Sequence, residues 1–109
     1  MIENRMNFFT DASATADSEI MVVNKANILT IEVVGAGTFS LDVKATVGVD
    51  EDNFTTIQGI KLNDFTVVGS ITSAGIYEFD ITNVSKVQVS LGSVSGGTVS
   101  VIGVTRSDV

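Results

Sequence analysis

The chain has 109 residues, a length that suits one folded domain and is too short for two independent hydrophobic cores. Its 13 Asp and Glu residues outnumber 6 Lys and Arg, and the net charge of −7 argues against a nucleic-acid or anionic-membrane surface, because no basic patch can displace counterions from phosphates. Cys and His are absent, which removes thiol nucleophiles, imidazole bases, disulfides and nearly every type of zinc site.

The composition favours β-structure. The chain contains 17 Val, 12 Thr and 10 Ile but only 4 Leu, and side chains branched at Cβ suit a pleated sheet better than a helix. No run of apolar residues reaches the roughly 18 to 20 needed to cross a bilayer, and residues 1–10 lack the apolar core of a secretory signal. We therefore expect a protein that stays in the cytoplasm when made, or that leaves the cell without the general export route.

Residues 1–19 differ in character from the rest of the chain. The stretch 10–19 is small and polar, with no period of 2 or 3.6, and predicts an extended or mobile arm ahead of a domain over 20–109. Met6, Phe8 and Phe9 form an apolar cluster just before this stretch. The cluster either folds back on its own domain or docks on a neighbouring subunit.

From residue 20 onward, short apolar or alternating segments recur between turns rich in glycine. The clearest is 38–47, where Phe39, Leu41, Val43, Ala45 and Val47 share one face and polar residues share the other. We predict about eight strands, at 20–24, 28–34, 38–47, 54–60, 66–71, 76–81, 86–91 and 98–105. This pattern predicts an all-β fold, an antiparallel β-sandwich of jelly-roll-like or immunoglobulin-like type, with a partly open barrel as the second choice.

The later strands follow the same alternation. We expect the side chains of Tyr77, Phe79, Ile81, Val87, Val89 and Leu91 to point into the core. The segment 93–97 reads as a loop that ends in Gly96-Gly97. The last strand is apolar on both sides, which indicates either contact with a second subunit through Ile102 and Val104 or a bulge at Gly103.

An acidic hairpin tip is the densest polar cluster. Asp50, Glu51, Asp52 and Asn53 offer the hard oxygen ligands that Ca²⁺ prefers, and Asp50 and Asp52 are the weak candidates for a cation site. The spacing is not that of an EF-hand loop, so we favour a solvated turn and expect neither a metal nor a cofactor.

Glu78 and Asp80 share a strand face and raise the question of glycoside hydrolysis, which uses two carboxylates. Their partner could be Glu32, Asp42 or Asp64. Sugar clefts need aromatic platforms, whereas the chain has no Trp and its single Tyr points to the predicted core. Outward charges are also the ordinary state of a soluble sheet and discourage edge pairing. We therefore predict a protein that is not an enzyme and has no catalytic residues.

Several motifs resemble those of small β-sandwich proteins from tailed-bacteriophage particles and prophages. The segment 70–90 reads SITSAGIYEFDITNVSKVQVS, similar to an I-T-x-x-G-x-Y turn and strand followed by V/L-x-K/R-V-x-V. The segment 95–101 reads SGGTVSV, and 39–45 reads FSLDVKA ahead of an acidic turn, both similar to strands of these proteins. The resemblance covers roughly residues 38–105.

The resemblance implies a structural component of the virion, such as a capsid decoration protein, a head-fibre domain or a tail accessory, assembled in the host cytoplasm. It implies other virion proteins, of capsid or tail, as partners and a homo-oligomer, for example a trimer. The net charge of −7 is the reason to expect no nucleic-acid or membrane partner. The interface candidates are Met6, Phe8, Phe9, Ile102 and Val104. The alternative is a module that binds carbohydrate or a cell surface through the loops 50–53 and 93–97.

Overall fold

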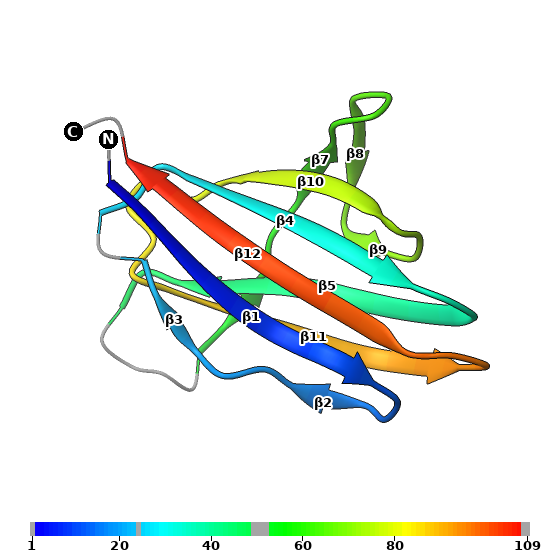
Figure 1. Cartoon of the computed structure of the whole chain (residues 1–109). Helices are drawn as coiled ribbons and strands as arrows, with labels where there is room; N and C mark the ends of the chain where they lie inside the picture. The colour runs from blue at the N-terminus through cyan, green and yellow to red at the C-terminus, as the bar shows by residue number, and fades with distance from the viewer. Residues whose placement is uncertain (1, 24, 49–52, 108–109) are drawn as a thin grey trace.

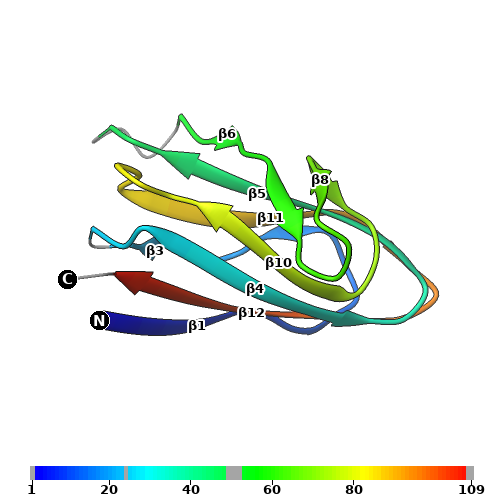
Figure 2. The same ribbon diagram turned by 90° about the horizontal axis from the view of Figure 1, so that it is seen from above.

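The computed structural model describes residues 2–23, 25–48 and 53–107, which form a sandwich of two antiparallel sheets (Figures 1 and 2). The first sheet has the order β1-β12-β4-β10-β7-β8, with the bounds β1 Ile2–Ala12, β12 Val99–Ser107, β4 Ile28–Gly35, β10 Gly75–Asp80, β7 Gly59–Lys61 and β8 Thr66–Val68. The second has the order β2-β11-β5-β6, with β3 paired to β11 and β9 to β5. Its bounds are β2 Ala16–Asp17, β3 Met21–Val22, β5 Thr38–Thr46, β6 Thr55–Thr56, β9 Ser70–Ile71 and β11 Lys86–Ser95.

The all-β antiparallel sandwich predicted from the alternating pattern is confirmed. The core between the sheets holds the predicted inward side chains, and its largest fully buried members are Tyr77, Phe79, Leu29, Ile31, Leu41, Ile71, Ile81 and Leu91. Phe39, Val43 and Ala45 are buried as expected, but Val47 is 75% exposed because β5 ends at Thr46.

Within the described ranges, no helix is long and apolar enough to span a membrane.

The described residues form twelve strands, where the sequence predicts about eight. The segment 54–60 divides into β6 in one sheet and β7 in the other, and 66–71 divides in the same way into β8 and β9. In the sequence, each of these two segments looks like a single strand, because its apolar character continues through the point where the chain crosses from one sheet to the other. The predicted loop 93–97 also differs from the structure. β11 continues to Ser95, so only residues 96 and 97 of the predicted loop lie beyond the strand.

The N-terminal segment differs most from expectation. Residues 2–12 are not a free arm but the longest strand, β1, paired antiparallel with β12 from Ile2–Ser107 to Ala12–Val99. The stretch that follows also belongs to the sandwich, since β2 pairs with β11 and the Oγ atom of buried Ser18 accepts a hydrogen bond from the backbone N–H of Val89 at 2.9 Å.

The register of β1 explains why its sequence does not read as a strand. It shifts between Asn7 and Phe9, so Phe8 is an extra residue opposite no partner of its own. Such a bulge breaks the period of two, and here the buried Phe8 is followed at once by half-buried Phe9. Gly103, where a bulge was the alternative, keeps a regular pairing with Met6 and with Ile31 on its two sides.

Candidate functional site

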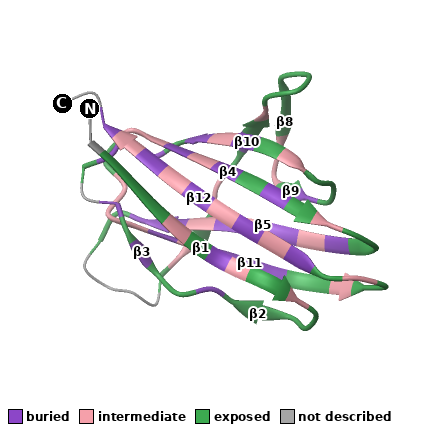
Figure 3. Ribbon diagram, viewed as in Figure 1, coloured by how far each residue is buried: buried purple, intermediate pink, exposed green. Residues whose placement is uncertain are grey.

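The outer surfaces of the two sheets differ in chemistry. On β12 the inward residues are buried, and strand alternation turns Ile102 and Val104 outward, where they remain half-buried (Figure 3). We use the term outer patch for the apolar side chains on this surface of the first sheet: Ile28, Val34, Ile60, Val67, Ile76, Ile102 and Val104. The outward positions of β5 and β11 in the second sheet are instead polar: Ser40, Asp42, Lys44, Lys86, Gln88 and Ser90.

Two shallow hollows divide the outer patch. The first, of about 220 Å³, brings Ile76, Ile102 and Val104 together with Thr30 and Glu32, and Arg5 and Arg106 stand on its rim. Cross-strand pairing accounts for this, because Ile102 and Ile76 lie on either side of Glu32 in adjacent strands. The hollow therefore combines three apolar side chains with a carboxylate between them and two arginines beside them, a mixture of apolar and charged groups that protein-docking surfaces share.

The second hollow, of about 650 Å³, lies between β4, β10 and the β7–β8 hairpin. Its apolar side chains are Ile28, Ile60 and Val67, and its polar ones include Glu78 and Asp80. The two sequence-predicted carboxylates therefore face the same hollow. Asp42 is not among their neighbours, since it lies in the second sheet and accepts a hydrogen bond from Ser70 Oγ at 2.6 Å.

The carboxylates of Asp80 and Asp64, which lie at turns, already accept hydrogen bonds from nearby residues. The Thr82 backbone N–H, 3.0 Å from Asp80 Oδ1, and the Thr82 hydroxyl lower the pKa of Asp80 below its ordinary value. The hydroxyl and the backbone N–H of Thr66 likewise lower the pKa of Asp64. A general acid needs a raised pKa, so Asp80 lacks the property that glycoside hydrolysis demands of one carboxyl group.

The cation candidates Asp50 and Asp52 lie outside the described residues. Among the residues that the structure does describe, no three Asp, Glu, His or Cys side chains come together in a way that could hold a metal ion.

The three N-terminal interface candidates serve the chain's own core. Phe8 is 6% exposed within the core, and Met6 and Phe9 are half-buried against it. Of the two readings of this cluster, the structure shows the fold-back onto its own domain. Ile102 and Val104 remain the interface candidates that face outward.

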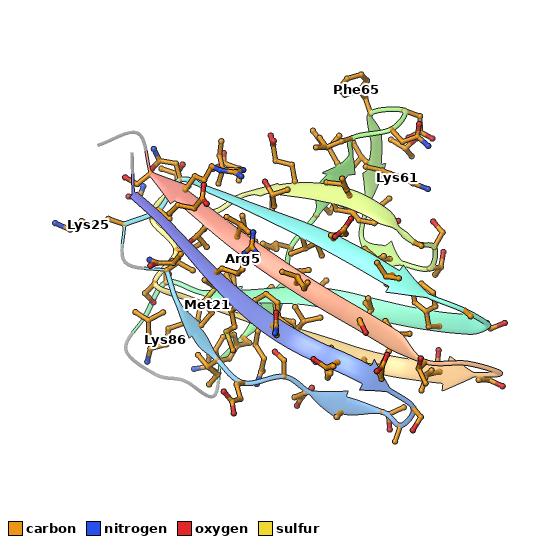
Figure 4. All side chains as sticks on the ribbon, in the orientation of Figure 1. Arg5, Met21, Lys25, Lys61, Phe65 and Lys86 are labelled. Carbon is orange, nitrogen blue, oxygen red and sulfur yellow. The ribbon has the colours of Figure 1, made fainter. Side chains whose placement is uncertain are left out.

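Sequence reasoning missed an exposed aromatic residue at the tip of the β7–β8 hairpin. Phe65 is 76% exposed with φ = 61°, a left-handed conformation that a bulky residue rarely adopts (Figure 4). Its backbone N–H donates to the Lys61 carbonyl at 2.7 Å, and Lys61 Nζ in turn donates to Ser73 Oγ at 3.1 Å. The only signal in the sequence is an aromatic residue directly after the turn-forming pair Asn63-Asp64.

The sequence matches the XepA family model over residues 3–105, which is nearly the whole chain. The chain belongs to the XepA family. Two solved structures share the fold of this XepA-family chain. It is 26% identical to the SPBc2 prophage-derived protein YomS, with a TM-score of 0.84, 95% of this chain covered and 92% of YomS.

The second solved structure is the PBSX exported protein XepA itself. The identity is 24%, the TM-score is 0.88, and the match covers 95% of this chain but 37% of XepA. The XepA-family chain thus spans little more than a third of XepA, and this second likeness shows the fold alone. A search of curated proteins gives no match.

Proposed function

We propose that this protein is a non-enzymatic accessory component of a bacteriophage particle, which binds another virion protein through the outer patch. The family membership supports a phage association, because YomS is described as prophage-derived and matches over nearly the full length of both chains. The sequence motifs in 39–45, 70–90 and 95–101 point the same way. Capsid decoration is the role that suits a small, acidic, single-domain chain best, since net negative charge limits aggregation of a protein made in many copies.

The observation that carries the docking role is the contrast between the two outer surfaces. A sheet with one wet surface ordinarily alternates apolar and polar residues, as β5 does. β12 departs from this rule by placing Ile102 and Val104 outward, in the hollow that Ile76 of β10 also lines across β4. Apolar side chains gathered on one surface, where the long strands β5 and β11 of the other surface present polar ones, mark a protein contact.

The absence of catalysis is part of the same proposal. Glu78 and Asp80 are the strongest candidates for a catalytic carboxylate pair, and both lie on an open strand surface. Asp80 is held in its charged form by Thr82. These groups give the second hollow a negative rim that can orient a basic partner segment.

Binding to particles of the phage that encodes the chain tests this proposal. We expect the labelled protein to sediment with those particles. The double substitution Ile102→Asp with Val104→Asp should weaken the binding by at least about tenfold, because charged side chains would then replace two apolar contacts of the outer patch. The matched control, Ser40→Asp with Gln88→Asp, adds the same charge to the second sheet and should bind like the parent. Circular dichroism checks that both variants keep the fold. Failure of the parent protein to bind, or equal loss in both variants, would contradict the proposal.

A further inference from the structure

The two hollows of the outer patch follow the outer face of β10 from one end to the other. Ile76 lines the smaller hollow, and Glu78 and Asp80 line the larger one. The β7–β8 hairpin extends this face beyond β10 (Figure 1), so that Ile60 stands directly opposite Glu78 and Val67 directly opposite Ile60. The outer face of β10 is thus hollowed and has apolar side chains beside it.

The outward side chains of β10 are one apolar group followed by two carboxylates. Ile76, Glu78 and Asp80 point to the same side of the sheet, and neighbouring members of this set are about 7 Å apart along the strand. On β4, Glu32 stands opposite Ile76 and lies diagonal to Glu78, at a separation of about 7–8 Å. Three negative charges therefore line the middle of the outer patch.

These carboxylates keep the capacity to bind a partner. Glu78 is half-buried and Glu32 is exposed, and neither forms a hydrogen bond or an ion pair with any described residue. Asp80 Oδ1 accepts the backbone N–H of Thr82 at 3.0 Å, but a carboxylate has about four acceptor positions. Partial burial of an unpaired charge is unfavourable, so a cation supplied from outside would be favoured at Glu78.

The three cations on the strands of the first sheet are directed elsewhere. Lys61 of β7 pairs with buried Tyr77 and so lies on the opposite face of the sheet. Arg106 is two strands from β10, a distance of about 10 Å, and forms an ion pair with Glu3 at 3.0 Å. Arg5 is three strands away, at about 14 Å. Charge complementarity therefore calls for a basic partner over β10.

We propose that the outer face of β10 binds an extended segment of a partner protein, which places an apolar side chain over Ile76 and basic side chains over Glu78 and Asp80. Alternate residues of an extended chain point the same way at a repeat of about 7 Å, which is also the repeat of the outward side chains of β10. The segment has one apolar and two basic residues at every second position, and the residues between them face solvent. This inference rests on the proposed function for the place of the partner in the virion and adds the partner's sequence pattern.

The apolar neighbours of β10 determine the strength of such binding. An isolated exposed ion pair contributes little, so charge alone would hold the segment only weakly. The hydrocarbon parts of Lys or Arg side chains would pack on Ile60 and Val67 of the hairpin and on Ile28 of β4, all of which line the larger hollow. Water is thereby excluded from the ion pairs, which strengthens them.

Synthetic peptides and the purified chain test the pattern without any particle. The peptide Leu-Thr-Lys-Thr-Lys-Thr-Leu, capped at both ends and labelled with fluorescein, has the required spacing in either direction. The control Leu-Lys-Lys-Thr-Thr-Thr-Leu has the same composition, but its adjacent lysines point to opposite sides of an extended chain. In fluorescence anisotropy at low salt, we expect the first peptide to bind at least about fivefold more tightly. Absence of binding, or equal binding of the two peptides, would overturn the proposal.

Charge reversal at one position tests the register. Glu78→Lys should weaken binding of the first peptide at least about tenfold, because it replaces an attraction by a repulsion. The same variant should instead prefer Leu-Thr-Glu-Thr-Lys-Thr-Leu, whose glutamate can lie over position 78. Glu19→Lys is the matched control, since Glu19 is exposed on the segment between β2 and β3 and the net charge changes equally. Circular dichroism checks the fold of both variants, and equal losses of binding in both would contradict the register.

Competition on particles separates this inference from the proposed function. An excess of the first peptide should release the labelled protein from particles, and protein that stays bound at saturating peptide would overturn the inference. If the protein sediments with particles but binds no peptide, the sequence pattern is wrong and the proposed function stands. If the peptides bind as predicted but the protein does not sediment with particles, the pattern stands and the proposed function is contradicted.

Discussion

The ring of Phe8 fills the place that a side chain at position 103 would occupy. A Cβ atom on Gly103 would lie 2.3 Å from Cε2 of Phe8 and 3.3 Å from Cδ1 of Leu29. The bulge in β1 turns Phe8 inward, and its ring packs against the backbone of β12 at Gly103, which has no side chain. The N-terminal strand is therefore fixed to the sandwich by an aromatic ring as well as by its ladder of hydrogen bonds.

This contact predicts strong coupling between the two positions. Phe8→Ala should reduce the free energy of unfolding by about 3–5 kcal/mol, and Gly103→Ala by about 1–3 kcal/mol, because the new methyl group and the ring cannot share one place. In the double variant the ring is gone, and the added methyl group should cost little or partly fill the cavity. Urea denaturation of all four proteins measures the cycle. Costs that simply add would contradict the contact.

The aromatic residues at the centre of the core give a second prediction. Phe39 and Phe79 are 3% and 1% exposed, so replacement of either by Ala should cost about 3–5 kcal/mol. Val47, which is predicted from the sequence to share the inner face with Phe39 but is exposed, is the control, and Val47→Ala should change the urea midpoint little. A large loss at Val47 would mean that β5 extends further than the structure shows.

The buried phenol of Tyr77 gives a third prediction. Its Oη donates to the Ser73 carbonyl oxygen at 2.7 Å, which ties β10 to the turn that precedes it. Tyr77→Phe removes this bond while it keeps the ring in the core, and should cost about 1 kcal/mol. Tyr77→Ala loses the ring as well and should cost several times more. Thermal unfolding of the two variants distinguishes the hydrogen bond from the packing, and equal losses would assign no role to the bond.

Acid should weaken the turn after β10. Because Thr82 lowers the pKa of Asp80, the stability that Asp80 contributes is present above its unfolded pKa of about 3.9 and is lost as pH falls through the lower folded value. The urea midpoint of the parent should therefore exceed that of Asp80→Asn at pH 7, and the difference should shrink between pH 5 and 3. Glu78→Gln removes a charge from the same strand without this hydrogen bond and is the control. A difference that grows in acid would contradict the assignment.

The sheets and most of the core could be predicted from the sequence because their strands alternate regularly. Phe39, Tyr77 and Val87 are buried for the reason that their spacing suggests. β1 could not be predicted as a strand because the bulge at Phe8 interrupts the alternation of its side chains. The pairs β6–β7 and β8–β9 each looked like one strand because nothing in a sequence marks the point where the chain changes sheet.

The candidate site was predictable only in part. Outward Ile102 and Val104 stood out because β12 is apolar on both sides, but their meeting with Ile76 depends on the order of strands, which the sequence does not encode locally. Phe65 escaped for another reason, since a single aromatic residue in a polar turn looks the same whether its ring is buried or exposed.

Electron microscopy of particles from the phage that encodes the chain, with gold-labelled antibody against this protein, tests the central claim most directly. We predict gold at regularly repeated positions on the parent particle, and bare particles when the encoded protein carries Asp at both 102 and 104. Particles without gold, in a lysate where the protein remains free, would contradict a place in the virion.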